Sequence, residues 1–156
     1  MFAYLKDLLA PEIRKTHPED ISKDEKIKTA TCVLFIELAR ADGDISDDEK
    51  KLLRKIIKNR YDLSSESVDK LLEYSEIKRE ESLDLFQFTS VINSSFSGRE
   101  KFNLMINLWQ LVYSDNKLDK YEDHIIKKIG GLLNLEHKDI IDAKLLVKEK
   151  KQKDNS

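Results

Sequence analysis

The sequence predicts an all-α fold, a bundle of about seven helices built from two related helix-turn-helix halves. Apolar residues recur at the three- and four-residue spacing of amphipathic helices along most of the chain. Only four glycines and two prolines occur in 156 residues, which are too few turn-forming residues for an all-β protein. A chain of this length, with 40% hydrophobic residues, is expected to form one soluble globular domain.

The first expected helix spans about 23–41 and is the most apolar. It begins at Ser22-Lys23-Asp24-Glu25, which has the capping-box pattern of a serine followed three residues later by a glutamate. From Ala30 to Ala41 it is apolar on nearly all sides. A helix of this kind belongs in the middle of a bundle.

The remaining helices follow from further capping signals and apolar spacing. Ser46–Glu49 and Ser97–Glu100 repeat the capping-box pattern and predict helix starts. In the second of these helices, Trp109 is expected to be a core residue. The six helices are expected at about 47–59, 65–77, 82–95, 98–113, 119–133 and 136–149, with Leu83, Phe86, Val91 and Ile92 facing the core in the third of them.

Both ends of the chain are expected to lie outside the helical domain, which is assigned to 22–149 with related halves at about 24–77 and 98–149. The N-terminal segment 1–21 opens with the amphipathic stretch Met1–Ala10, which could dock on the domain, on a protein partner or on a membrane surface as a peripheral contact. The tail 150–156 is rich in lysine and is expected to be basic and disordered.

Charge and cysteine content restrict the partners and the compartment. The chain has 28 basic and 30 acidic residues, a net charge of -2, so no overall field favours nucleic acid, which is an unlikely partner. The single cysteine, Cys32, excludes an intramolecular disulfide and is expected to be a small buried hydrophobe. A reducing, intracellular setting is indicated, and no apolar run approaches the ~20 residues that span a bilayer.

The two halves are related through a repeated elbow between helices. The stretch Phe35–Glu49 returns in diverged form as Leu108–Glu122. Each copy is an apolar helix that runs into a turn and closes on a glutamate, and each turn opens with aspartate followed by a residue tolerant of positive φ. The match continues into the next helix, where Leu52, Leu53 and Ile56 correspond to Ile125, Ile126 and Ile129.

The first elbow concentrates negative charge and allows two interpretations. Its acids are Asp42, Asp44, Asp47, Asp48 and Glu49, with no basic residue among them. In one interpretation they stabilise the first turn of the next helix, and Glu49 completes the capping box. In the other, Asp42 and Glu49, with Asp44, supply oxygen ligands to Ca²⁺ or Mg²⁺. An EF-hand does not fit, because only seven steps separate Asp42 from Glu49.

Glu37 and the second elbow bear on the same question. Glu37 lies in an otherwise apolar helix, so it needs a cation, a hydrogen-bond network, a route to solvent, or an ion pair with Arg40 or Arg54. The second elbow has Asp115 and Glu122 at the matching positions, but nearby lysines offset its acids. If the elbows bind metal, we therefore expect the first elbow to bind it more tightly than the second.

Catalysis is not expected. The three histidines, His17, His124 and His137, have no partners at metal-ligand or triad spacing. No glycine-rich phosphate loop follows a strand, and no organic cofactor is predicted.

Two stretches carry a resemblance to a known family, namely Ile36–Ser46 followed by Glu49 and its echo Leu108–Asp119 followed by Glu122. They resemble the tellurite-resistance TerB family, and the similar region covers about 24–147. The resemblance implies an all-helical bundle of two halves, a cytoplasmic bacterial setting and a link to tellurite or stress response or to envelope-associated assemblies. It also implies a divalent-cation site that falls on Glu37, Asp42 and Glu49, with Asp115 and Glu122 in the repeat. The alternative is a metal-free scaffold for a protein partner or a membrane surface.

Overall fold

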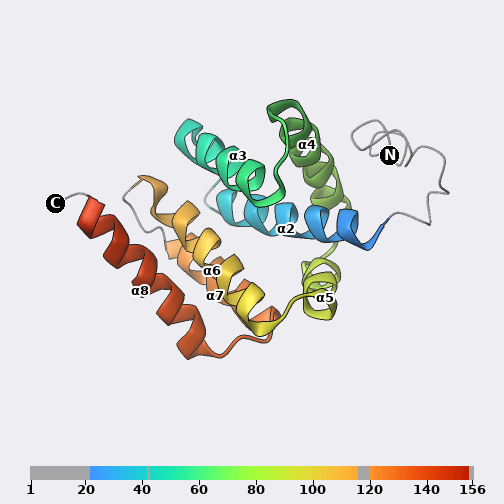
Figure 1. Ribbon diagram of the computed structural model, residues 1–156. Coiled ribbons are helices and arrows are strands. Elements are labelled where there is room, and N and C mark those ends of the chain that lie inside the picture. The colour runs from blue at the N-terminus through green and yellow to red at the C-terminus, as the bar shows by residue number, and fades with distance from the viewer. Residues whose placement is uncertain (1–21, 42, 116–119, 155–156) are drawn as a thin grey trace.

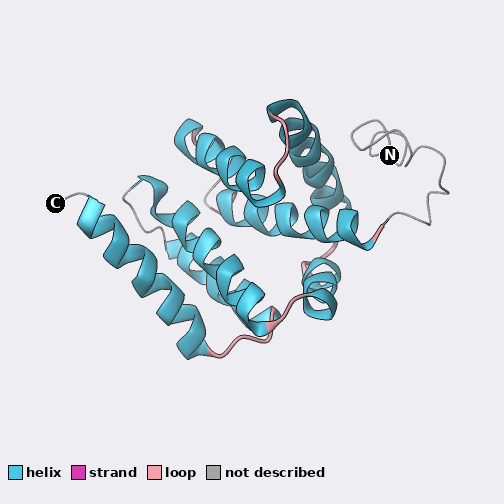
Figure 2. Ribbon diagram, viewed as in Figure 1, coloured by secondary structure: helices cyan, strands magenta, loops and turns pink. Residues whose placement is uncertain are grey.

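The computed structural model describes residues 22–41, 43–115 and 120–154 and confirms the all-α prediction (Figures 1 and 2). Within these residues seven α-helices are present and no strand. A short 3-10 helix, η3 (Tyr113–Asp115), follows α6. The helices are α2 (Lys23–Ala39), α3 (Asp47–Tyr61), α4 (Ser65–Glu81), α5 (Phe86–Ser95), α6 (Gly98–Val112), α7 (Lys120–Leu132) and α8 (His137–Asp154).

Helix α2 is the centre of the bundle, as its apolar sequence predicts. It packs against α3, α4, α5, α6 and α7, and in Figure 1 it runs between α3 and α4 on one side and α5 to α7 on the other. Leu34, Phe35 and Leu38 have no exposed surface. Because burying one such side chain contributes about 1.5–3 kcal/mol, this helix supplies a large share of the stabilising burial.

Helix α6 is the second core helix and holds α8 in place. Trp109 is fully buried, as predicted, and its Nε1 donates a hydrogen bond to the carbonyl oxygen of Ile140 in α8 at 3.0 Å. Helix α7 packs closely against the same residue. A Cβ atom on Gly130 would lie 2.5 Å from Ile140 Cδ1, so this position has no room for a side chain unless Ile140 moves.

The junction between α4 and α5 differs from the prediction. Helix α4 continues to Glu81, and α5 begins at Phe86 rather than near 82. The reason is local, because Asp84 Oδ1 accepts a hydrogen bond from the Phe86 amide at 2.8 Å and places the turn there. Leu83 and Phe86 are therefore exposed, at 104% and 66%, and the prediction that they face the core is wrong.

The buried face of α5 is formed by Leu85, Phe88 and Ile92. Of the four residues predicted to face the core, Ile92 is buried, and Val91 is partly buried and packs against the core.

The two chain ends have different outcomes. Helix α8 continues to Asp154, so the prediction of a disordered tail from 150 is wrong for 150–154. Lysine favours helix, and Lys153 pairs with Glu149 one turn earlier at 3.7 Å. The segment 1–21, including Met1–Ala10, lies outside the described residues. Among the residues that are described, no helix combines the length and hydrophobicity needed to cross a membrane.

Candidate functional site

The first elbow connects α2 to α3 through a sharp turn. Arg40 ends α2, and the Gly43 amide donates to the Arg40 carbonyl oxygen at 3.0 Å. Gly43 has φ +124°, a conformation that side chains disfavour, so the predicted need for a flexible residue here is confirmed. Asp44 is exposed, whereas Asp42 lies outside the described residues.

Glu49 closes this elbow and has two features. It completes the predicted capping box, since Ser46 Oγ accepts from the Glu49 amide at 3.1 Å and the Ser46 amide donates to Glu49 Oε1 at 3.4 Å. It is also buried, with only 5% of its surface exposed.

Capping does not require this burial, as the capping box of α6 demonstrates. There the Ser97 amide donates to Glu100 Oε1 at 2.9 Å, and Glu100 is exposed. The hydrogen bonds from Ser97 hold the pKa of Glu100 below its usual range, as expected for a carboxylate at a helix start. Glu49 makes the same local bonds and is nevertheless buried against the body of the protein.

The second elbow repeats this arrangement at Glu122. Glu122 is the third residue of α7, as Glu49 is of α3, and it is only 4% exposed. The Asp115 backbone belongs to η3, but its side chain lies outside the described residues, as do residues 116–119. The two elbows therefore share one feature that their sequences alone do not reveal, a buried glutamate in the first turn of the following helix.

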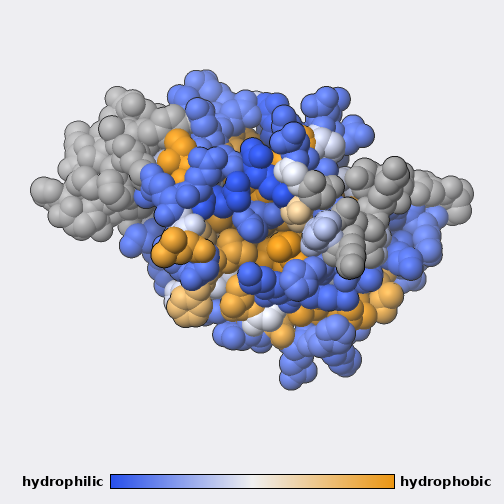
Figure 3. Space-filling view, turned by 180° about the vertical axis from the view of Figure 1, so that it is seen from behind, coloured by the Kyte–Doolittle hydropathy of each residue, from blue (hydrophilic) through white to orange (hydrophobic). Residues whose placement is uncertain are grey.

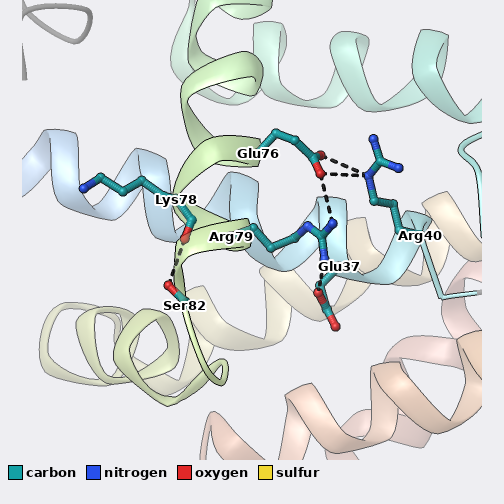
Figure 4. A network of polar contacts seen from close by, with 6 residues as sticks. All are labelled: Glu37, Arg40, Glu76, Lys78, Arg79 and Ser82. Carbon is teal, nitrogen blue, oxygen red and sulfur yellow. Dashed lines mark hydrogen bonds and ion pairs between the residues drawn. The ribbon is translucent and has the colours of Figure 1, made fainter. Parts of the chain in front are cut away.

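Glu37 is held in a network of ion pairs (Figure 4). Its Oε2 accepts from Arg79 Nη1 at 3.0 Å, and Arg79 Nη2 also contacts Glu76 at 3.0 Å. Arg40 Nε pairs with the same Glu76 at 3.0 Å. Glu37, Glu76 and Arg79 are each less than one third exposed, so solvent screens these contacts incompletely.

The predicted partners of Glu37 were therefore wrong, since Arg40 binds Glu76 and Arg54 binds Asp69. Burial by itself would lower the pKa of Arg79, but its bonds to Glu76 and Glu37 outweigh burial and raise that pKa. The network keeps Arg79 charged and neutralises Glu37 without a metal ion.

A family model described as "Tellurite resistance protein TerB" matches residues 28–145. The chain belongs to the TerB family. The match extends from α2 into α8 and contains both elbows, in agreement with the resemblance seen in the sequence. No curated protein and no solved structure gave a significant match.

The candidate ligands of this TerB chain are only partly brought together by the described residues. Among those residues, no group of three or more His, Cys, Asp or Glu side chains is arranged to hold a metal ion. Asp42 and the Asp115 side chain are not part of that set. The proposed ligands therefore stay a prediction.

Other reactive side chains of the TerB chain lie apart from the elbows. Cys32 has no exposed surface, and burial raises the pKa of its thiol to about 12, which agrees with the predicted role as a small hydrophobe. His124 and His137 are exposed, and His17 lies outside the described residues.

Sequence reasoning missed Arg79 as the partner of Glu37, 42 residues away. The only local signal is the three-residue spacing of Glu76 and Arg79, which marks an ion pair on one helix face.

Proposed function

We propose that this TerB-family chain is a non-enzymatic helical module that binds a divalent cation, Ca²⁺ or Mg²⁺, at its first elbow. The observation that carries the proposal is the combination of a buried carboxylate, Glu49 at 5% exposed, with the acidic turn that it closes. The exposed Glu100 makes the same capping bonds, so the helix cap alone does not account for the environment of Glu49.

The donor set fits a hard cation. Asp42, Asp44 and Glu49 supply carboxylate oxygens, and the turn adds backbone carbonyl oxygens, the ligands that Ca²⁺ and Mg²⁺ prefer. The same stretch has five acids within eight positions, whose mutual repulsion a bound cation would relieve. Asp115 and Glu122 form the corresponding, weaker site in the second elbow.

Glu37 fits this site less well than the other candidates. Its Oε2 is engaged by Arg79 at 3.0 Å, so a cation that took Glu37 as a ligand would compete with a guanidinium already in place. We therefore place the first site on Asp42, Asp44 and Glu49 and assign Glu37 to the ion-pair network.

The test is thermal unfolding of chelator-treated protein with and without millimolar CaCl₂ or MgCl₂. A metal present at 100 times its dissociation constant stabilises the fold by about 2.7 kcal/mol, and about 1 kcal/mol raises the Tm by about 2–4 °C in a domain of this size. We expect the metal-dependent shift in the wild type and its loss in Asp42→Asn with Glu49→Gln.

The matched control is Glu100→Gln, which removes the same cap carboxylate from α6. It lowers the Tm in the absence of metal through the cap, and we expect it to keep the full metal-dependent shift. A shift that persists in Asp42→Asn with Glu49→Gln would refute the proposed ligands.

A role in tellurite or stress response, or in an envelope-associated assembly, is the biological setting that we propose from the family. A metal-free interaction scaffold is the second candidate, and exposed apolar side chains favour it. Leu83 and Phe86, three positions apart in the chain, are 104% and 66% exposed. Figure 3 shows hydrophobic surface among hydrophilic side chains on the rear face of the molecule. Absence of any stabilisation by Ca²⁺ or Mg²⁺ would favour this second candidate.

A further inference from the structure

A pocket of about 640 Å³ lies between α3, α6, η3 and α8, and its lining includes Tyr113 and Ser114 at the start of the second elbow. Helix α6 contacts both α3 and α8, and residues of all three helices line the pocket; Figure 1 shows how the three helices are arranged. Its volume is within the range of about 300–1,000 Å³ that small-molecule sites occupy.

The charged side chains that line this pocket are all basic. They are Lys55, Arg60, Lys150 and Lys151, and none of the lining residues that the structure describes is acidic. In the described part of the chain, none of these four forms an ion pair with a carboxylate. Elsewhere in the bundle, Arg40, Arg54 and Arg79 each do.

Arg60 is held in place by uncharged side chains, and the carboxylate that its charge influences, Glu100, is exposed. Its Nη1 donates to Asn107 Oδ1 at 2.8 Å, and Asn107 Nδ2 in turn donates to Gln110 Oε1 at 2.9 Å. The guanidinium also lies 5.8 Å from the ring centre of Phe96 and 6.0 Å from that of Tyr61. A positioned guanidinium with free donors is well suited to an oxyanion.

The negative ends of the helix dipoles offset only part of this positive charge. The C-terminal turns of α3, α6 and α8 all contribute to the pocket wall, and each carries roughly half a negative charge. Three such ends amount to about −1.5 charges against four cations, which leaves an excess of more than two positive charges. The dipoles therefore favour cations here but do not balance them.

We propose that this pocket binds a soluble organic phosphate of nucleotide size. The phosphate would pair with Arg60 and the three lysines, whereas Leu52, Ile56 and Val147 offer an apolar wall to the carbon part of the ligand. This site shares no residue with the proposed cation site, so either proposal can fail while the other stands.

The experiment is a titration of the full chain with ADP at low ionic strength, followed by calorimetry and by NMR of backbone and side-chain amides. We expect saturable binding with shift changes centred on the amides of Asn59, Asn107 and Gln110, which line the pocket. Adenosine, which lacks phosphate, should not bind, and inorganic phosphate should bind more weakly than ADP.

The test variant is Lys55→Gln with Lys150→Gln, and the control is Lys101→Gln with Lys128→Gln, which removes the same charge from positions outside the pocket. We expect ADP affinity to fall at least tenfold in the test variant and to change less than twofold in the control. Equal losses of ADP affinity in both variants would mean that the overall charge of the protein accounts for binding, and would overturn the proposal. Failure of ADP to bind the wild type, or binding only to vesicles that contain a phosphoinositide, would also overturn it.

Discussion

Replacing Gly130 by alanine is expected to destabilise the fold, whereas the same replacement at the neighbouring Gly131 is expected to stabilise it. A Cβ atom on Gly130 would lie 2.5 Å from Ile140 Cδ1 and 2.7 Å from Ile140 Cγ1, both far inside van der Waals contact. A Cβ atom on Gly131 would meet nothing within 4 Å. The two positions share one helix, so helix propensity is nearly the same for both.

The magnitude follows from two opposing effects. Alanine favours a helix over glycine by about 0.5–1 kcal/mol, and this gain applies at both positions. At Gly130 the Ile140 side chain, only 3% exposed, has to move within a packed core, and overpacking of this kind costs about 1–3 kcal/mol. The net expectation is a loss of up to about 2.5 kcal/mol for Gly130→Ala and a gain of up to about 1 kcal/mol for Gly131→Ala.

Urea denaturation of both variants measures these differences directly, and Ile140→Val provides the cross-check. Removing Cδ1 relieves the closest contact, so Gly130→Ala combined with Ile140→Val should be less destabilising than the sum of the two single changes. Equal stability of Gly130→Ala and Gly131→Ala would refute the close approach of α7 to α8 at this point.

Two further predictions concern the bundle interior. Arg79→Met should lower the free energy of unfolding by about 1–2 kcal/mol, because it leaves the partly buried Glu37 without its partner. Arg54→Met should cost less than about 1 kcal/mol, because the ion pair of Arg54 is about half exposed. Thermal unfolding compares the two variants, and equal losses would contradict the importance of the network. The Cys32 thiol, whose pKa burial raises to about 12, stays protonated at pH 8 and should react with a thiol reagent only at the rate of unfolding; rapid labelling of the native protein would contradict its burial.

The parts of the fold that depend on local sequence could be predicted. The caps at Ser46 and Ser97 are formed by residues within three positions of each other, so the pattern contains all the groups that make the bonds. At Ser22 the hydroxyl accepts from the Glu25 amide at 3.2 Å, as the same pattern predicts. The central place of α2 also follows locally, because a helix that is apolar on all sides has to be surrounded.

The parts that depend on distant residues could not be predicted. The partner of Glu37 lies on another helix, and an acidic residue in an apolar helix indicates that a partner is needed without indicating which one. The start of α5 was misplaced because Leu83 and Phe86 fit the helical spacing as well as Leu85 and Phe88 do, and only packing decides which pair is buried. The basic pocket combines residues of three separate helices and η3, although the basic residues that follow Glu49 along α3 are a signal that the sequence did contain.

The elbows lie between these cases. Their acids, their turn and their repetition are visible in the sequence, whereas the burial of Glu49 and Glu122 is not, since an exposed Glu100 has the same pattern. Glu25 in the first turn of α2 is also buried, at 4%, so burial of a first-turn glutamate is not confined to the elbows.

Calorimetric titration of chelator-treated protein with Ca²⁺ is the direct test of cation binding at the first elbow. We expect saturable binding with one tighter site per chain, lost in Asp42→Asn with Glu49→Gln and retained in Glu100→Gln. No saturable binding of either Ca²⁺ or Mg²⁺ at millimolar concentration would contradict it and leave Glu49 as a buried helix cap.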